Sequence, residues 1–425
     1  MPIAALPEYI GRQDLATASP GMRFGMYLPI WTERADQEKQ IRKMAGAKSP
    51  QGRELARILR EDGMDAAIEH VERARGRFPK LWEKNDQAAH AAWRQVAWLT
   101  RDDLRRVDAL FERQFALATA LGGEDRLLIL DAQSTAPFTT GLGNEHPLEN
   151  GFAFLWPYGL PYLPGSGVKG VLRQAARELA GLTEAQWQIE SEWNEAAILA
   201  LFGSEDSNDA QRGALSFWDV IPRIAGDHLS VEVMTGHQAH YYMKDEPPHE
   251  SGQPVPVYFL TVPPRSGFTF HVVCDRPFLR RVALDLAEDD RWKMLLQQAF
   301  EHAFDWLGFG AKTAVGYGVM ERDETAEQQR EAQAKQAAFE QLSPEQRQIE
   351  ALRKVFEEEV KKGTLGAGSQ TPQKRLELLQ AALEWEDAGL RRQAAALIRE
   401  TLKRLPWSKK QKKQGIDEKL QRLEQ

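Results

Sequence analysis

The chain has 425 residues, a formal net charge of −7 and a hydrophobic fraction of 42%. This length predicts two or three structural units, and the apolar content is enough for a packed core. The lone cysteine, Cys274, excludes an intramolecular disulfide framework and is typical of a reducing compartment. No apolar run approaches the length of a membrane span, so we expect a cytoplasmic protein without membrane contact.

The negative net charge argues against a free-standing nucleic-acid binder with a basic field over its whole surface. It does not exclude a local basic groove, because affinity for nucleic acid follows the phosphates that are neutralised at the contact. The charge balance therefore favours a subunit that neighbouring proteins hold in place within a larger complex.

Residues 1–124 are predicted to form an N-terminal helical region. Apolar residues recur at helical spacing from Leu55 to Val71 and again from Trp93 to Phe111, and Gly122 and Gly123 end this pattern. We find no catalytic cluster in this region. Its tryptophans are expected to pack a helical core, and the alternative is an interface with a partner subunit.

Residues 125–320 are predicted to form an α+β core in which strands and helices alternate. Strands are expected over residues 126–132, 215–220, 229–234, 255–262, 267–273 and 317–320, and helices after residue 166 and over 292–306. The linker Pro263–Ser266 indicates a hairpin. The order strand, helix, strands, helix, strand is typical of a ferredoxin-like or RNA-recognition-like fold with large insertions. Such sheets can hold single-stranded RNA on an open face.

The turn Pro164-Gly165-Ser166-Gly167 leads into a helix that carries Lys169 and Arg173. Ser166 can cap this helix, and the two cations stand four residues apart on one face. Cations in the first turns oppose the helix dipole, and a bound polyanion would offset that cost. We expect the amides of Gly165 to Gly167 and both cations to contact RNA phosphates. The alternative is a solvated basic face.

A second candidate segment contains His237, His240, Tyr241 and Tyr242. Two histidines with a nearby lysine can perform general acid-base cleavage of RNA, and the same groups can stack on bases without any chemistry. The two histidines could also be metal ligands, but no cysteine lies nearby in the sequence to complete such a site. We expect RNA binding here, with a contact to a neighbouring subunit as the alternative.

The segment from Gly308 to Gly318 contains four glycines, one lysine and no carboxylate, and it follows the predicted helix 292–306. Glycine permits positive φ, and successive amides in such a loop can form an anion-binding concavity. The alternative is a turn whose glycines serve geometry alone. We expect a second phosphate-contacting wall with Tyr317 packing or stacking nearby, formed by Gly308, Gly310, Lys312, Thr313, Gly316 and Gly318.

Asp131 and Asp219 are the carboxylates that a metal-dependent nuclease would draw on. We find no pair of carboxylates at suitable spacing in the core, so both are expected to face solvent at strand ends. The sequence predicts no catalytic residue, no metal and no cofactor.

Residues 321–425 are predicted to form a C-terminal helical extension, interrupted between Lys361 and Thr371. Apolar residues from Leu376 to Ile398 indicate a small helical hairpin or bundle. The basic residues between Lys403 and Lys413 are typical of a solvated end, and a secondary contact with RNA is the alternative.

The proline-glycine-serine turn before Lys169-Gly170-Val171-Leu172-Arg173, together with the late glycine-rich loop, resembles the RAMP superfamily of CRISPR effector proteins. Segments 140–151, 213–219 and 234–242 also fit this resemblance, which extends over roughly residues 125–320 and points to type III-B complexes. It does not reach the helical regions on either side.

The resemblance implies a non-catalytic RNA-binding subunit that caps the backbone of the effector near the 3′ end of the guide. Its expected partners are guide RNA, target RNA and other RAMP subunits. Two alternatives remain open: a guide-processing endoribonuclease of the same superfamily that acts through a histidine, and a protein scaffold whose glycine loops only shape turns.

Overall fold

The computed structural model comprises two compact units, residues 1–326 and 327–425. The predicted three-part division, with boundaries after residues 124 and 320, stays a prediction. None of the helices in the described part of the chain is both long and apolar enough to cross a membrane. The structure describes residues 4, 16–74, 76–79, 81, 86–121, 125–181, 192–204, 210–236, 247, 255–366, 368–407 and 416–424.

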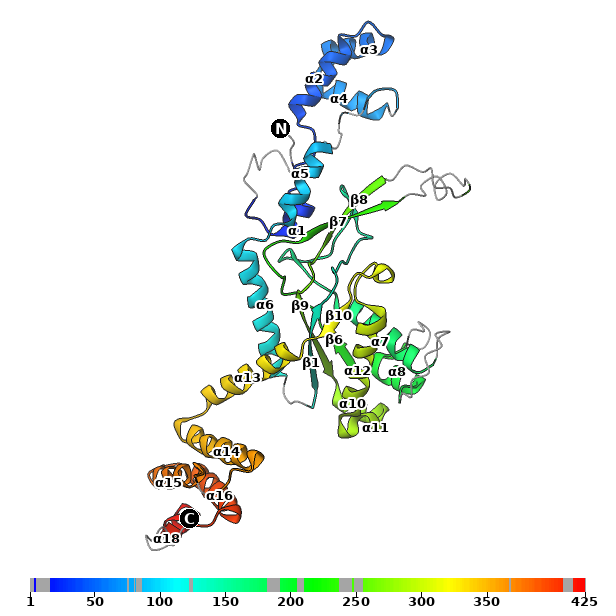
Figure 1. Cartoon of the computed structure of the whole chain (residues 1–425). Helices are drawn as coiled ribbons and strands as arrows, with labels where there is room; N and C mark the ends of the chain where they lie inside the picture. The colour runs from blue at the N-terminus through cyan, green and yellow to red at the C-terminus, as the bar shows by residue number, and fades with distance from the viewer. Residues whose placement is uncertain are drawn as a thin grey trace. The chain divides into compact units, whose positions relative to one another are not determined.

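Helices α1 to α6 precede the central sheet, as the apolar spacing predicted (Figure 1). Ile41, Leu55 and Val71 belong to a small core of their own within α2 to α4. Trp93 of α5 instead joins the main core. The bounds of these helices are Pro20–Gly25, Arg34–Ala45, Pro50–Glu61, Gly63–Arg73, Asp86–Ala97 and Arg101–Ala120.

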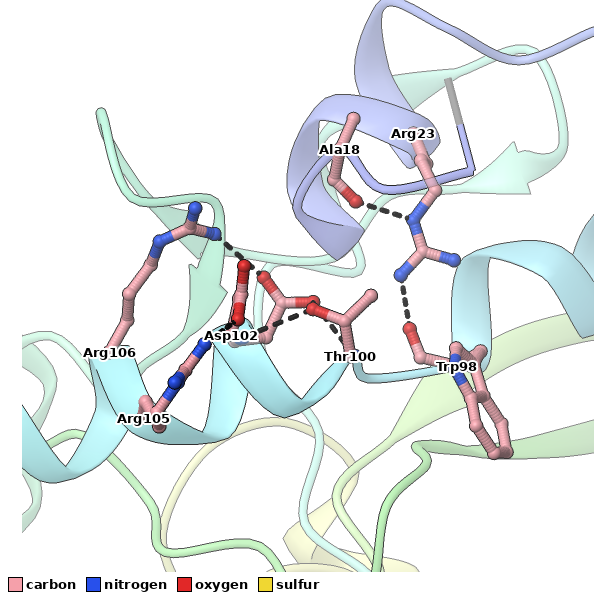
Figure 2. A network of polar contacts seen from close by, with 8 residues as sticks. Ala18, Arg23, Trp98, Thr100, Asp102, Arg105 and Arg106 are labelled. Carbon is pink, nitrogen blue, oxygen red and sulfur yellow. Dashed lines mark hydrogen bonds and ion pairs between the residues drawn. The ribbon is translucent and has the colours of Figure 1, made fainter. Parts of the chain in front are cut away.

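A buried arginine fastens α1 to the chain that leads into α6 (Figure 2). Arg23 is 6% exposed, and its Nε donates to the carbonyl of Ala18 at 2.8 Å. Its other nitrogens donate to the carbonyls of Gln95 and Trp98. Burial lowers the pKa of the Arg23 guanidinium. The three carbonyls therefore satisfy a charge that would be costly to bury alone.

The main sheet has the strand order β10-β1-β9-β6, with neighbouring strands antiparallel. In the register of β1 and β9, Leu128 lies opposite Val272 and Leu130 opposite Phe270. These apolar side chains share one face, because side chains alternate along a strand. The strand bounds are Leu127–Ser134 for β1, Leu215–Phe217 for β6, Gly267–Cys274 for β9 and Met320–Arg322 for β10.

Helices α7 (Gly165–Leu179) and α12 (Arg291–His302) lie side by side on one side of this sheet (Figure 1). The rings of Phe270 in β9 and Phe300 in α12 are 5.1 Å apart at their centroids. Leu172 and Leu296 are fully buried in the same core. The remaining elements of this unit are β2 (Glu145–His146), β3 (Glu149–Asn150), β4 (Phe154–Leu155), β5 (Leu160–Pro161), α8 (Glu195–Phe202), α10 (Arg276–Val282) and α11 (Leu284–Ala287).

The polar side of β1 carries Asp131, which is 2% exposed. Its Oδ1 accepts a hydrogen bond from Thr269 Oγ1 at 2.5 Å and lies 3.9 Å from Arg223 Nη2. The Arg223 guanidinium in turn lies over the ring of Phe111 in α6, 4.6 Å from its centroid. The expectation that Asp131 faces solvent is therefore wrong, because β1 continues to Ser134 and places Asp131 inside the strand.

The predicted hairpin around Pro263–Ser266 is also wrong. Strand β8 (Val255–Thr261) pairs with β7 (Ser230–Gly236) in a separate two-stranded ribbon, whereas β9 pairs with β1 and β6. The linker instead crosses between the two sheets. Ser266 is buried, and its amide donates to Ser134 Oγ at the end of β1.

The second unit contains the helices α14 (Pro344–Lys362), α15 (Thr371–Ala382), α16 (Ala388–Arg404) and α18 (Ile416–Glu424), and α13 (Glu324–Gln341) spans the unit boundary. Its core is separate and includes Leu352, Leu379 and Ile398. The interruption after Lys362 is closed by Glu359, whose carboxylate accepts from the amides of Gln370 and Thr371 at the start of α15. Helical regions before and after the central sheet in the sequence are thus confirmed.

Candidate nucleic-acid interface

Helix α7 begins against the end of β6. Pro164 is its N-cap residue, so the expectation that Ser166 caps the helix is wrong. The amides of Gly167 and Val168 donate to the carbonyl of Pro164, and the amide of Gly165 donates to Asp219 Oδ1 at 2.7 Å. A Cβ on Gly165 would lie 2.3 Å from the carbonyl oxygen of Phe217, so this approach requires glycine.

Asp219 therefore stabilises the start of α7 from 54 positions further along the chain. Its side chain is exposed, as predicted, but its carboxylate has a structural partner. A carboxylate at a helix N-terminus stabilises the free amides and the dipole. Ser166 is exposed, and within the described part of the chain its amide has no hydrogen-bond partner.

Lys169 and Arg173 share one flank of α7, as predicted. Each residue of an α-helix is rotated by about 100° from the one before it. Lys169 and Arg173 therefore point roughly 120–160° away, around the helix axis, from the flank that carries Gly167 and Val171. The flank of Val171 faces α12, because Glu178 on the same flank is 2.7 Å from His302 Nε2. The two cations thus lie on the other side of the helix.

All four glycines of the late loop have a left-handed backbone. Their φ angles are 68° at Gly308, 94° at Gly310, 93° at Gly316 and 71° at Gly318. Added Cβ atoms would lie 2.3 Å from the Thr139 carbonyl oxygen at Gly310 and 1.8 Å from the Phe309 carbonyl oxygen at Gly318. Nothing lies within 4 Å at Gly316. The backbone angles thus favour glycine at all four positions, and the close contacts also exclude a side chain at Gly310 and Gly318.

Backbone hydrogen bonds fix this loop to the segment that follows β1. The amide of Ala311 donates to the carbonyl of Thr139, and the amide of Gly318 donates to the carbonyl of Pro137, both at 2.8 Å. The amide of Phe309 donates to the carbonyl of Gly318. Several amides of the loop are therefore engaged internally. Among the described residues, the amides of Gly310, Lys312 and Thr313 have no such partner.

Lys312 and Tyr317 hold the loop against the ribbon of β7 and β8. The Lys312 ammonium lies 5.3 Å from the ring centroid of Phe259 and 2.8 Å from Met234 Sδ. The ring of Tyr317 contacts Phe259 edge-on, with centroids 5.6 Å apart. Partial burial and the charge of Glu232 raise the pKa of Tyr317. The loop therefore contacts the ribbon of β7 and β8 directly.

The start of α7 and the glycine loop meet at an open cleft of about 350 Å³. The cleft brings together Ser166, Gly167 and Gly310 of the predicted site, whereas Lys169, Arg173 and Lys312 do not line it. The segment Thr140–Gly143 supplies a third wall, which the sequence analysis used only as support for the family resemblance and did not assign to the site. Its two glycines, Gly141 and Gly143, are the sequence feature that could have identified this segment as part of the cleft. The full lining is Thr140, Gly141, Leu142, Gly143, Leu163, Pro164, Ser166, Gly167, Val171, Gly310 and Ala311.

The remaining predicted site residues, His237, His240 and Tyr241, lie outside the described residues. Strand β7 ends at Gly236, directly before them. Within the ranges that the structure describes, no three side chains of His, Cys, Asp or Glu gather as they would to hold a metal ion.

Residues 131–321 match the family model of the RAMP superfamily. A curated relative, the CRISPR system Cmr subunit Cmr6 of Pyrococcus furiosus, is 27% identical over 231 residues. The match covers 42% of this chain and 63% of the relative, so the chain spans less than two thirds of that relative's length.

Solved structures of CRISPR complexes and subunits are also similar to this chain. A type III-B Cmr-beta complex bound to cognate target RNA contains a chain with 19% identity and a TM-score of 0.41, over 56% of this chain and 72% of that one. The crystal structure of Cmr6 from Pyrococcus furiosus has 23% identity and a TM-score of 0.29, over 46% of this chain and 98% of that one. A chain of a type IV-B CRISPR complex has 16% identity and a TM-score of 0.31, over 47% of this chain and 89% of that one.

Proposed function

From the match of residues 131–321 to the RAMP superfamily model, we propose that the protein is a guide-RNA-binding subunit of a type III-B effector complex. The curated relative is the sixth Cmr subunit, which gives the proposal its place in the complex. The proposal includes the position near the guide 3′ end and the contacts with target RNA and other RAMP subunits that the resemblance of the sequence motifs implies.

The observation that carries the RNA-binding proposal is the cleft between the start of α7 and the glycine loop. The two segments are about 140 residues apart in the chain, yet both contribute backbone to its walls. Glycines let an RNA strand approach the backbone closely, and amides such as that of Ser166 can donate to phosphate oxygens. Lys169 and Arg173 would contact phosphates that continue around the other flank of α7.

The strand order also supports a ferredoxin-like core. If β1, β6, β9 and β10 are numbered along the chain, the sheet order β10-β1-β9-β6 reads 4-1-3-2. Helix α7 follows the first of these strands and α12 follows the third, which is the β-α-β-β-α-β succession of that fold. We propose this assignment for the central sheet.

We propose that this subunit is not an enzyme. The two carboxylates that a metal-dependent nuclease could draw on both have structural partners: Asp131 bonds Thr269, and Asp219 bonds the start of α7. In this proposal His237, His240 and Tyr241 bind RNA or a neighbouring subunit.

Photo-crosslinking of the assembled complex tests the RNA contact. We expect guide-RNA adducts in the peptides that contain Thr140–Gly143, Ser166–Lys169 and Gly310–Thr313. A scaffold without RNA contact would give none of these adducts. A salt titration of RNA binding adds a second readout, because each phosphate contact of a single strand contributes about 0.7 to the slope of log Kd against log salt.

Lys169→Gln together with Arg173→Gln should therefore lower this slope by about 1.4. The matched control is Arg280→Gln with Arg281→Gln, which removes two exposed arginines from α10, a helix that does not line the cleft. An equal change in both pairs would indicate a general charge effect and contradict the proposal.

Incubation with repeat RNA in chelator tests the alternative of a guide-processing nuclease. Site-specific cleavage by the natural chain that is lost in His237→Ala would overturn the non-catalytic assignment.

A further inference from the structure

Helices α2 and α3 form a hairpin whose connecting corner, residues 42–53, is strongly basic. The corner contains Arg42, Lys43, Lys48 and Arg53 and no Asp or Glu, so four positive charges fall within 12 positions of a chain whose net charge is −7. All four side chains are exposed. The corner lies outside the cleft and outside the part of the chain that the family model matches.

The backbone holds the two sides of this corner close together. Ile41 of α2 and Leu55 of α3 are fully buried in the same small core. Gly52 is also buried, and a Cβ there would lie 2.1 Å from the carbonyl oxygen of Ala47, so this close approach requires glycine. Ser49 Oγ accepts from the amide of Gly52 at 3.0 Å. The four cations are therefore gathered at one end of the hairpin.

Acidic residues neutralise other cations of α2 to α4. Arg34 pairs with Asp65, Lys39 with Asp36, Arg57 with Glu61 and Arg73 with Glu69.

In contrast, none of the four cations of the corner has an ion pair or a side-chain hydrogen bond within the described residues of the chain. Like charges that lack counter-charges repel one another, and an external polyanion would relieve that repulsion.

The helix dipoles account for only half of this charge. Arg42 and Lys43 are in the last turn of α2, where positive charge is favourable. Lys48, however, directly precedes the N-cap residue Ser49 of α3, and the first turn of α3 contains no acidic residue. Positive charge is unfavourable there because the free amides form the positive end of the dipole. Lys48 and Arg53 thus serve no purpose in the stability of α3.

We propose that the corner 42–53 binds the phosphate backbone of single-stranded RNA. Arginine and lysine are the side chains that neutralise phosphates. Protein interfaces are built around aromatic or large apolar anchors, but the only such residue of the corner is Met44, which packs against the core of α2 to α4. The composition thus favours RNA over an acidic protein. The inference rests on the proposed function only in that RNA lies within reach in the complex.

The test measures binding of the full chain to a labelled single-stranded RNA of mixed sequence across a titration of potassium chloride. Glutamine replaces all four cations, because it preserves helix propensity at exposed positions. Four lost phosphate contacts should lower the slope of log Kd against log salt by about 2.8. The corner variant is Arg42→Gln, Lys43→Gln, Lys48→Gln, Arg53→Gln.

The matched control removes the same charge from ion-paired positions of the same helices and should leave the slope unchanged. It is Arg34→Gln, Lys39→Gln, Arg57→Gln, Arg73→Gln. A smaller variant, Lys48→Gln with Arg53→Gln, separates binding from folding. Its slope should fall by about 1.4, whereas its melting temperature should not fall, because no favourable dipole contact is lost.

The inference is overturned if the corner variant and its control change the slope equally, or if neither changes it. It is equally overturned if the corner variant keeps the slope but no longer co-purifies with a partner subunit, because the corner then binds protein. The variant Lys169→Gln, Arg173→Gln distinguishes the two RNA contacts. A slope that falls there but not in the corner variant contradicts this inference alone, and the reverse contradicts only the contact at α7.

Discussion

Lys312 lies with its ammonium 5.3 Å from the ring centroid of Phe259, which couples the glycine loop to the ribbon of β7 and β8. The same ammonium is 2.8 Å from Met234 Sδ. A lysine that sequence reasoning assigned to RNA thus also stabilises the protein. The two roles predict different consequences of substitution, and both can be measured.

We expect Lys312→Gln to lower the free energy of unfolding of the 1–326 unit by about 0.5–1 kcal/mol, because it removes a cation over an aromatic face. Urea unfolding followed by tryptophan fluorescence measures this, since ten of the 12 tryptophans precede residue 327. Lys169→Gln serves as the control and should stay within about 0.5 kcal/mol of the natural chain. Equal stability of the two variants would contradict the structural role of Lys312.

Two glycines of the loop should differ sharply in tolerance. Gly316→Ala places a Cβ in open space, so it meets no steric contact. Its only cost is the strain of an alanine in the left-handed backbone conformation, about 1–2 kcal/mol. Gly318→Ala adds a contact at 1.8 Å with the Phe309 carbonyl oxygen and should displace the loop.

We therefore expect Gly318→Ala to melt several degrees below Gly316→Ala, at about 2–4 °C per kcal/mol, and to weaken RNA binding as well. Thermal unfolding and RNA titration of both variants provide the check. Equal melting temperatures would show that Phe309 moves aside without cost.

Cys274 should react slowly with thiol reagents in the folded protein. Burial raises its pKa to about 12, so at pH 8.5 the thiolate fraction is roughly a thousandfold below that of an unfolded chain. The folded state keeps a proton that the unfolded chain releases. The contribution of this thiol to stability therefore falls as the pH rises from about 9 to 12.

The measurement is the rate of labelling at pH 8.5 with and without denaturant, with Cys274→Ser as the unlabelled control. Native labelling at the denatured rate would place the thiol at the surface.

The sequence predicted the strands and helices of the core because their apolar periodicity is local. It did not predict that β8 pairs with β7, since a short linker between two strands is equally compatible with a hairpin and a crossover. The site shows the same division. The glycines at 310 and 318 were identified, but the carbonyls of Thr139 and Phe309 that require them are fixed only by tertiary contacts.

Substitution of Asp219 tests whether its carboxylate stabilises the start of α7 or acts in catalysis. Its Oδ1 accepts from the amide of Gly165 at 2.7 Å, beside the cleft. Asn keeps an acceptor oxygen and removes the negative charge, so Asp219→Asn should leave the fold intact and strengthen RNA binding. For a phosphate roughly 8 Å away in water the gain is about 0.5 kcal/mol, roughly twofold in Kd.

Filter binding at low and high salt measures this gain, which should shrink as salt screens the charge. Asp219→Ala is the matched variant, because it removes both the charge and the acceptor and should destabilise the start of α7 by about 0.5–2 kcal/mol. If Asp219→Asn instead weakened RNA binding, the carboxylate would be a contact that the ligand needs, and the proposed path of RNA along the cleft would have to be abandoned.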